Sequence, residues 1–74
     1  MLEDKDADVR LMTVMTLGKL KASELAKHAA ALVAKLEDED ARVRMATVQT
    51  LGKLKAAGML STEQQAKLVA AAQK

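Results

Sequence analysis

The chain lacks several residue types on which small folds often depend. Its 74 residues include no cysteine, which excludes disulfides and thiolate metal sites. The absence of Phe, Tyr and Trp leaves a core of Leu, Val, Met and Ala, and it removes the aromatic side chains on which nucleic-acid bases stack. No proline interrupts a composition rich in good helix formers. We therefore expect one small all-α domain over residues 1–74.

Charge and hydropathy narrow the function classes further. The net charge of +2, with both signs interspersed, is too weak to indicate a polyanionic partner. No apolar run approaches the ~20 residues of a membrane span, and the acidic start MLEDKDAD differs from a signal peptide. A cytoplasmic location without membrane contact is the default expectation.

The most informative feature present is an internal repeat. Residues 36–56 (LEDEDARVRMATVQTLGKLKA) restate residues 2–22 (LEDKDADVRLMTVMTLGKLKA) with a period of 34, and 16 of the 21 positions are identical. A period of this length is typical of stacked-repeat proteins, in which each unit buries its apolar face against its neighbours. The repeat predicts two units, over about 2–35 and 36–74, and favours an interaction module over an enzyme.

Capping residues and helical spacing predict four helices. Asp6, Asp40 and Ser61 are suitable N-caps, Ser61 with Gln64 fits a capping box, and Gly58 fits a left-handed helix stop. The expected helices run from Asp6 to about Lys21, from Ser23 through Leu25, Ala29, Leu32, Val33 and Leu36, from Asp40 to about Lys55, and from Ser61 onward. The short connections predict antiparallel neighbours.

Glycines and methionines add two expectations about packing. Gly18 and Gly52 recur at equal repeat positions inside helices, where each costs about 1 kcal/mol relative to alanine. Their recurrence predicts close approach of a neighbouring helix. Met45, which aligns with Leu11, and Met59, which precedes Leu60, are expected in the core.

One motif occurs in both copies. Asp38, Val43-Arg44 and the string LGKL at 51–54 repeat Asp4, Val9-Arg10 and LGKL at 17–20. This D-x4-VR pattern resembles the signature of HEAT repeats, and the resemblance covers nearly the whole chain. It implies a short α-solenoid of four antiparallel helices, about two HEAT-like repeats, which acts as a scaffold for other proteins.

The resemblance also implies a role for four charged residues. In HEAT repeats such Asp and Arg side chains hydrogen-bond between adjacent units, which makes Asp4, Arg10, Asp38 and Arg44 candidates for an inter-repeat ladder. The fixed donors of arginine suit this role, although solvated surface charge is the alternative. Ala7 and Ala41 stand where the family often has proline, which leaves the curvature of the stack open.

No arrangement of residues indicates catalysis or a metal site. The carboxylates clustered at 3–8 and 37–40 lack the spacing of a calcium loop, and helix capping explains them. His28 is the only histidine, and Ser23 and Ser61 are expected at helix starts without a nucleophile-elbow motif. We therefore expect no enzyme activity and no cofactor.

The two copies differ mainly on one helix face. Four of the five mismatches fall at positions 5, 8, 12 and 15, which is helical spacing, whereas the matched apolar positions supply the packing. The candidate partner-binding residues are Asp8, Met12, Met15, Lys19, Arg42, Ala46, Gln49 and Lys53. Both neutral drift and recognition explain such variation, but exposed Met12 and Met15 would mark an interface.

Two kinds of partner follow. A stack of about two units without polar caps should leave its ends open, which predicts a homo-oligomer, most simply a dimer. The alternative is nucleic-acid backbone binding by a basic ridge on the concave face, formed by Lys19, Lys21, Lys53, Lys55, Arg42 and Arg44. The sharp repetition fits both a piece of a longer solenoid and a designed repeat sequence.

Overall fold

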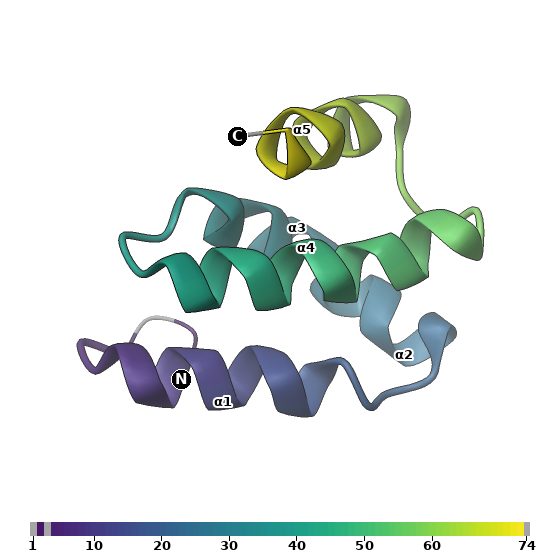
Figure 1. The fold of residues 1–74 in the computed structure, drawn as a ribbon. Helices are drawn as coiled ribbons and strands as arrows, with labels where there is room; N and C mark the ends of the chain where they lie inside the picture. The colour runs from purple at the N-terminus through teal and green to yellow at the C-terminus, as the bar shows by residue number, and fades with distance from the viewer. Residues whose placement is uncertain (1, 3, 74) are drawn as a thin grey trace.

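The computed structural model describes residues 2 and 4–73, and within them the chain is helical with no strand. Figure 1 shows α1 and α4 side by side and running in the same direction, α2 and α3 returning behind them, and α5 next to α4. The elements are α1 (Ala7–Leu17), α2 (Ala22–Leu25), a 3-10 turn (Ala26–His28), α3 (Ala29–Ala34), a second 3-10 turn (Lys35–Glu37), α4 (Ala41–Ala56) and α5 (Thr62–Ala72). The predicted all-α fold of four helical segments is confirmed.

Three of the predicted helix starts are confirmed by their caps. The Asp6 and Asp40 carboxylates accept the backbone N–H groups of Asp8 and Arg42, each at 2.8 Å. Ser61 Oγ accepts the Gln64 N–H at 3.1 Å, and the Gln64 side chain accepts the Ser61 N–H at 3.1 Å. These reciprocal bonds satisfy donors that have no partner within the helix.

The helix stop at Gly58 is also confirmed. Gly58 has φ 71°, and the N–H of Met59 donates back to the Leu54 carbonyl at 2.9 Å. This is the left-handed ending that glycine accepts at little cost.

The predicted end of the first helix is wrong. α1 ends at Leu17, and the N–H groups of Lys19 and Leu20 then make short turns to the carbonyls of Thr16 and Leu17. The identical string TLGKLKA remains helical in α4 as far as Ala56. Tertiary context decides the difference, because the chain must turn into α2 at Ala22, whereas Ala57 and Gly58 lengthen the later connection.

The predicted start of the second helix is wrong as well. Ser23 lies inside α2, which begins at Ala22 after an extended Lys21 that provides no side-chain cap. The two 3-10 turns divide the segment, yet its apolar side chains keep helical spacing. Leu25, Ala29, Leu32 and Leu36 are all buried.

The core is built from aliphatic side chains of every helical segment. Fully or nearly buried are Val14, Leu25, Ala29, Leu32, Leu36, Val43, Leu51, Leu54, Leu60 and Leu68. Thr47 is fully buried among them, and its hydroxyl donates to the Val43 carbonyl at 2.7 Å, which removes the cost of burying it.

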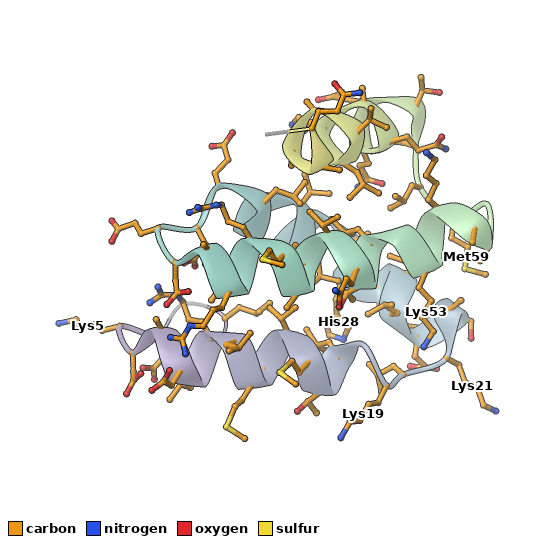
Figure 2. The ribbon with its side chains drawn as sticks, in the orientation of Figure 1. Lys5, Lys19, Lys21, His28, Lys53 and Met59 are labelled. Carbon is orange, nitrogen blue, oxygen red and sulfur yellow. The ribbon has the colours of Figure 1, made fainter. Side chains whose placement is uncertain are left out.

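Met45 and Met59 are not in this core, contrary to the expectation from sequence. Met45 is 65% exposed because no helix of the described residues covers its side of α4. Met59 is 42% exposed, since the turn at Gly58 leaves it outward and Leu60 takes the buried position. Figure 2 shows Met59 at the far end of α4.

The repeated glycines differ in their surroundings. A Cβ on Gly18 would meet Thr50 Oγ1 of α4 at 3.1 Å, which confirms close approach of a neighbouring helix. A Cβ on Gly52 would meet nothing within 4 Å, so the same expectation is wrong there. Gly52 occupies in α4 the position that Gly18 occupies after α1, but among the described residues no neighbouring side chain lies where its Cβ would be.

These surroundings predict different effects of alanine. Gly52→Ala should raise the free energy of unfolding by about 0.5–1 kcal/mol, because it adds helix propensity in open space. Gly58→Ala should lower it by about 1–2 kcal/mol, because its backbone is left-handed. Urea unfolding of dilute protein, followed by far-UV circular dichroism, measures both. Gly18→Ala is the matched comparison; a gain equal to that of Gly52→Ala would contradict the close approach to Thr50.

Candidate interaction surface

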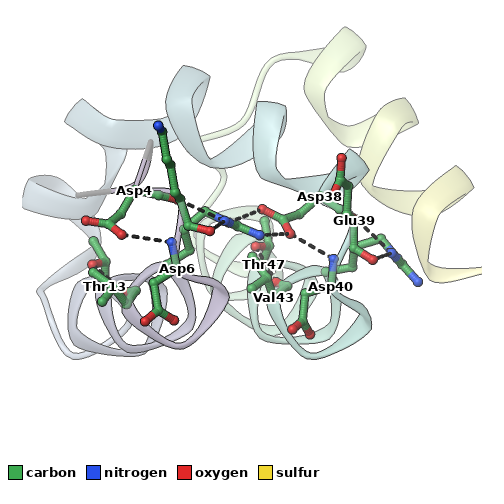
Figure 3. A network of polar contacts seen from close by, with 12 residues as sticks. Asp4, Asp6, Thr13, Asp38, Glu39, Asp40, Val43 and Thr47 are labelled. Carbon is green, nitrogen blue, oxygen red and sulfur yellow. Dashed lines mark hydrogen bonds and ion pairs between the residues drawn. The ribbon is translucent and has the colours of Figure 1, made fainter.

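A largely buried ion pair joins the two copies of the repeat. Arg10 Nε donates to Asp38 Oδ2 at 2.8 Å, and Arg10 Nη2 donates to Asp38 Oδ1 at 3.0 Å (Figure 3). Only 14% of the Arg10 side chain and 4% of the Asp38 side chain are exposed. The remaining guanidinium nitrogen, Nη1, donates to the carbonyls of Asp4 and Lys5 at 2.8 and 3.1 Å. One arginine thus joins α1, the segment before it and the start of α4.

Arg44 repeats half of this arrangement. Its Nη1 donates to the carbonyls of Asp38 and Glu39, as Arg10 does one repeat earlier. Among the described residues, however, no carboxylate pairs with Arg44. Asp4 shows the reverse, because its carboxylate accepts the Asp6 N–H at 2.8 Å but receives no arginine from the described part of the chain. Of the four predicted ladder residues, the structure pairs Arg10 with Asp38 only.

The arginine contacts lower the pKa values of two carboxyl groups. The hydrogen bonds from Arg10 hold the pKa of Asp38 below its ordinary value, and those from Arg42 lower the pKa of Asp40 to about 2. The same contacts raise the pKa values of Arg10 and Arg42. These pairs therefore stay ionised down to acidic pH.

A second contact between copies lies at the surface. Arg42 Nη2 donates to Asp8 at 2.9 Å and to Asp40 at 2.8 Å. Both Arg42 and Asp8 are largely exposed, so solvent screens their charges and their pairing adds little to stability. This contact brings together two of the predicted partner-binding residues without giving them much energy.

A shallow hollow of about 290 Å³ lies where α1 meets α4. It is lined by Met15, Gly18, Lys19, Ala46, Gln49, Thr50 and Lys53, and thus by five of the eight predicted partner-binding residues. Met15 is 55% exposed in it. Met12, at 66% exposed, is not among the lining residues, and Ala46 also packs against the core.

The lysines around this hollow differ in what they contact. Lys53 Nζ donates to the carbonyls of Gly18 and Leu20 at 2.8 and 3.0 Å, and thereby satisfies acceptors freed by the early end of α1. Lys19 and Lys21 lie in the turn beyond α1 and point outward (Figure 2). Arg42 and Arg44 also donate hydrogen bonds to acceptors within the chain. Part of the predicted basic ridge is therefore occupied by contacts inside the molecule.

A larger groove was not foreseen from the sequence. It has a volume of about 860 Å³ and lies between α4 and the end of α5, where Arg44, Met45, Val48 and Gln49 face Ala71 and Ala72. A comparison of the two repeats position by position could have located this groove. Met45 and Gly52 of α4 align with positions of the first repeat that a neighbouring helix covers.

The described residues show no group of three or more His, Cys, Asp or Glu side chains suited to a metal ion. His28 and Ser61 are exposed and belong to different segments. None of the described helices is both long and apolar enough to cross a membrane.

Comparison with known protein families agrees with the geometry. The family model for HEAT repeats matches residues 1–74. The chain belongs to the HEAT-repeat family. Its fold is accordingly a short α-solenoid of about two HEAT repeats, and this family generally supplies non-catalytic scaffolds for protein interaction. Comparisons with curated proteins and with solved structures gave no significant match.

Removing the Asp38 carboxylate should destabilise this HEAT-repeat chain strongly. Asp38→Ala takes two charge-assisted bonds from the mostly buried Arg10 and should cost about 3 kcal/mol. The matched control is Asp8→Ala, which breaks an exposed pair between the same two copies and should cost about 0.5 kcal/mol or less. Urea unfolding compares them, and equal losses would mean that the two ion pairs are equivalent.

The lowered pKa values also predict how stability depends on pH. Because Asp38 and Asp40 bind protons less readily when folded than when unfolded, their contribution is complete above the unfolded pKa, about 3.9. The free energy of unfolding should therefore be level from pH 7 to about 5 and fall as the pH approaches 2. The decline should be shallower for Asp38→Asn, and an unchanged pH profile in that variant would contradict the assignment.

Proposed function

We propose that this HEAT-repeat chain is a non-catalytic scaffold module that binds a protein segment at the hollow between α1 and α4. The observation that carries the proposal is Met15, an apolar side chain exposed within a depression that polar residues surround. Single exposed apolar side chains are common on protein surfaces, but Met15 lies within a hollow, and methionine suits adaptable binding surfaces.

The size of the hollow indicates what it would accept. A cavity of about 150 Å³ holds one benzene molecule. At about 290 Å³, the hollow has room for one large apolar side chain of a partner, anchored against Met15 and Ala46. Lys19, Gln49 and Lys53 at its rim would contact polar groups of the same segment. An apolar centre with a polar rim is the usual arrangement of a protein interface.

Peptides selected from a random displayed library against the chain provide the test. Met15→Glu should weaken the selected peptides at least about tenfold, since it places a charge where the apolar anchor binds. Met59→Glu is the matched control, because Met59 is a similarly exposed methionine outside the hollow. Isothermal titration of each variant measures the affinity.

Two outcomes would contradict the proposal. One is that no peptide binds at micromolar affinity. The other is that Met15→Glu and Met59→Glu bind the selected peptides equally, which would put the site elsewhere on the molecule. No structural observation favours the nucleic-acid alternative, since Arg42, Arg44 and Lys53 contact acceptors within the chain.

A further inference from the structure

The two copies of the repeat show what α1 and α4 look like with and without a neighbour. α4 packs along one side of α1, and there Val14 is fully buried and Gly18 approaches Thr50. The same side of α4 carries Val48, which is only partly buried, and Gly52, which has open space around it. This side of α4 opens onto the 860 Å³ groove.

On the other side of the two helices, α4 is the covered helix and α1 is the uncovered one. In α4, Thr47 is fully buried and Thr50 nearly so, because they face the interior of the stack. Their counterparts in α1 are more accessible, since Thr13 is only partly buried and Thr16 is exposed. Among the described residues, one face of α4 and one face of α1 are therefore uncovered, and the α1–α4 contact inside the chain shows that two such faces fit together.

We propose that the uncovered face of α4 binds the uncovered face of α1 in a second copy of this chain, head to tail. Arg44 then forms an ion pair with the Asp4 carboxylate of the second copy, as Arg10 does with Asp38 within the chain. Thr16 of the second copy packs against Gly52, as Thr50 packs against Gly18. This inference goes beyond the proposed binding at the hollow between α1 and α4, because it concerns a different surface and a different partner.

The polar groups on the two faces match in this pairing. Arg44 on the α4 side has no carboxylate partner among the described residues, and the Asp4 carboxylate on the α1 side receives no arginine from them. Head-to-tail stacking brings these two groups together one repeat along from the pair of Arg10 and Asp38. Two α4 faces or two α1 faces have no such contact inside the chain to imitate.

Two of the differences between the copies agree with the same pairing. Within the chain, Asp8 meets Arg42 at 2.9 Å, and Lys5 lines a hollow together with Glu39. Moving one repeat along the stack places Arg42 against Asp8 of the second copy and Glu39 against Lys5 of the second copy. At each of these positions the first and second repeats of one chain carry charges of opposite sign. Opposite charges therefore also meet where the second repeat of one chain contacts the first repeat of the next chain.

One contact of the internal interface does not carry over. Lys53 bonds to the carbonyls of Gly18 and Leu20 because α1 has already ended there. The corresponding carbonyls of Gly52 and Leu54 lie within α4, and Leu54 already accepts from Met59. The junction between copies is therefore weaker than the contact within the chain, and it belongs in the range of weak, reversible interfaces.

Light scattering with refractive-index detection tests the proposal, because the chain has no Trp or Tyr for absorbance. A head-to-tail junction does not close on itself. The mass should therefore rise from the monomer value of 7.9 kDa past that of a dimer. The rise is expected between roughly 10 µM and 1 mM, the range of weak association.

Two variants block one face each and leave the fold intact. Gly52→Leu fills open space on the α4 face, and Thr16→Arg replaces an exposed residue on the α1 face. Each should be monomeric alone, while their equimolar mixture should form a dimer that grows no further, because one intact face remains on each. Ala66→Leu, at an exposed position of α5 that lines neither the groove nor the hollow, is the matched control and should assemble like the parent chain.

Three results would overturn the head-to-tail junction. They are a parent chain that stays monomeric at every concentration, a parent assembly that Gly52→Leu leaves unchanged, and a mixture of the two variants that stays monomeric while the parent assembles. None of these bears on peptide binding at the hollow, which is read out through Met15.

Discussion

The contact between Arg10 and Asp38 sets the spacing on which the rest of this molecule depends. It is bidentate, nearly buried, and anchored further to the carbonyls of Asp4 and Lys5. A planar guanidinium accepts a carboxylate in only a few orientations, so this contact fixes how far one copy of the repeat is displaced from the next. The aliphatic core alone would tolerate sliding of one helix along another more readily, since dispersion contacts have little directionality.

That displacement explains why identical residues have different environments. Val14 and Val48 share their sequence position, yet one is enclosed by α4 and the other borders a groove. Gly18 and Gly52 differ in the same way. In a stack, the role of a residue depends on whether a neighbouring unit lies against it, and the surfaces that remain uncovered are shaped to receive a similar unit.

How much of this structure could be predicted from the sequence follows from the range of the interactions. The caps at Asp6, Asp40 and Ser61 and the stop at Gly58 depend on residues within five positions, and these predictions were correct. The end of α1 and the exposure of Met45 depend on helices elsewhere in the chain, and both predictions were wrong. The partner-binding face lies between these cases: helical spacing placed Met15 and Gln49 on one side, but the hollow appears only when α1 lies against α4.

The string TLGKLKA at 16–22 and 50–56 is a turn leading into a new helix in one place and continuous helix in the other. The helical and non-helical states of this string are therefore close in free energy, so the surrounding structure decides which one forms. Because the two strings have the same side chains, any spectroscopic difference between equivalent residues reports their surroundings and not their residue type. Backbone chemical shifts or amide exchange rates at Lys19 and Lys53 thus compare two environments on one sequence, which makes the chain its own reference for the effect of tertiary context on a helix end.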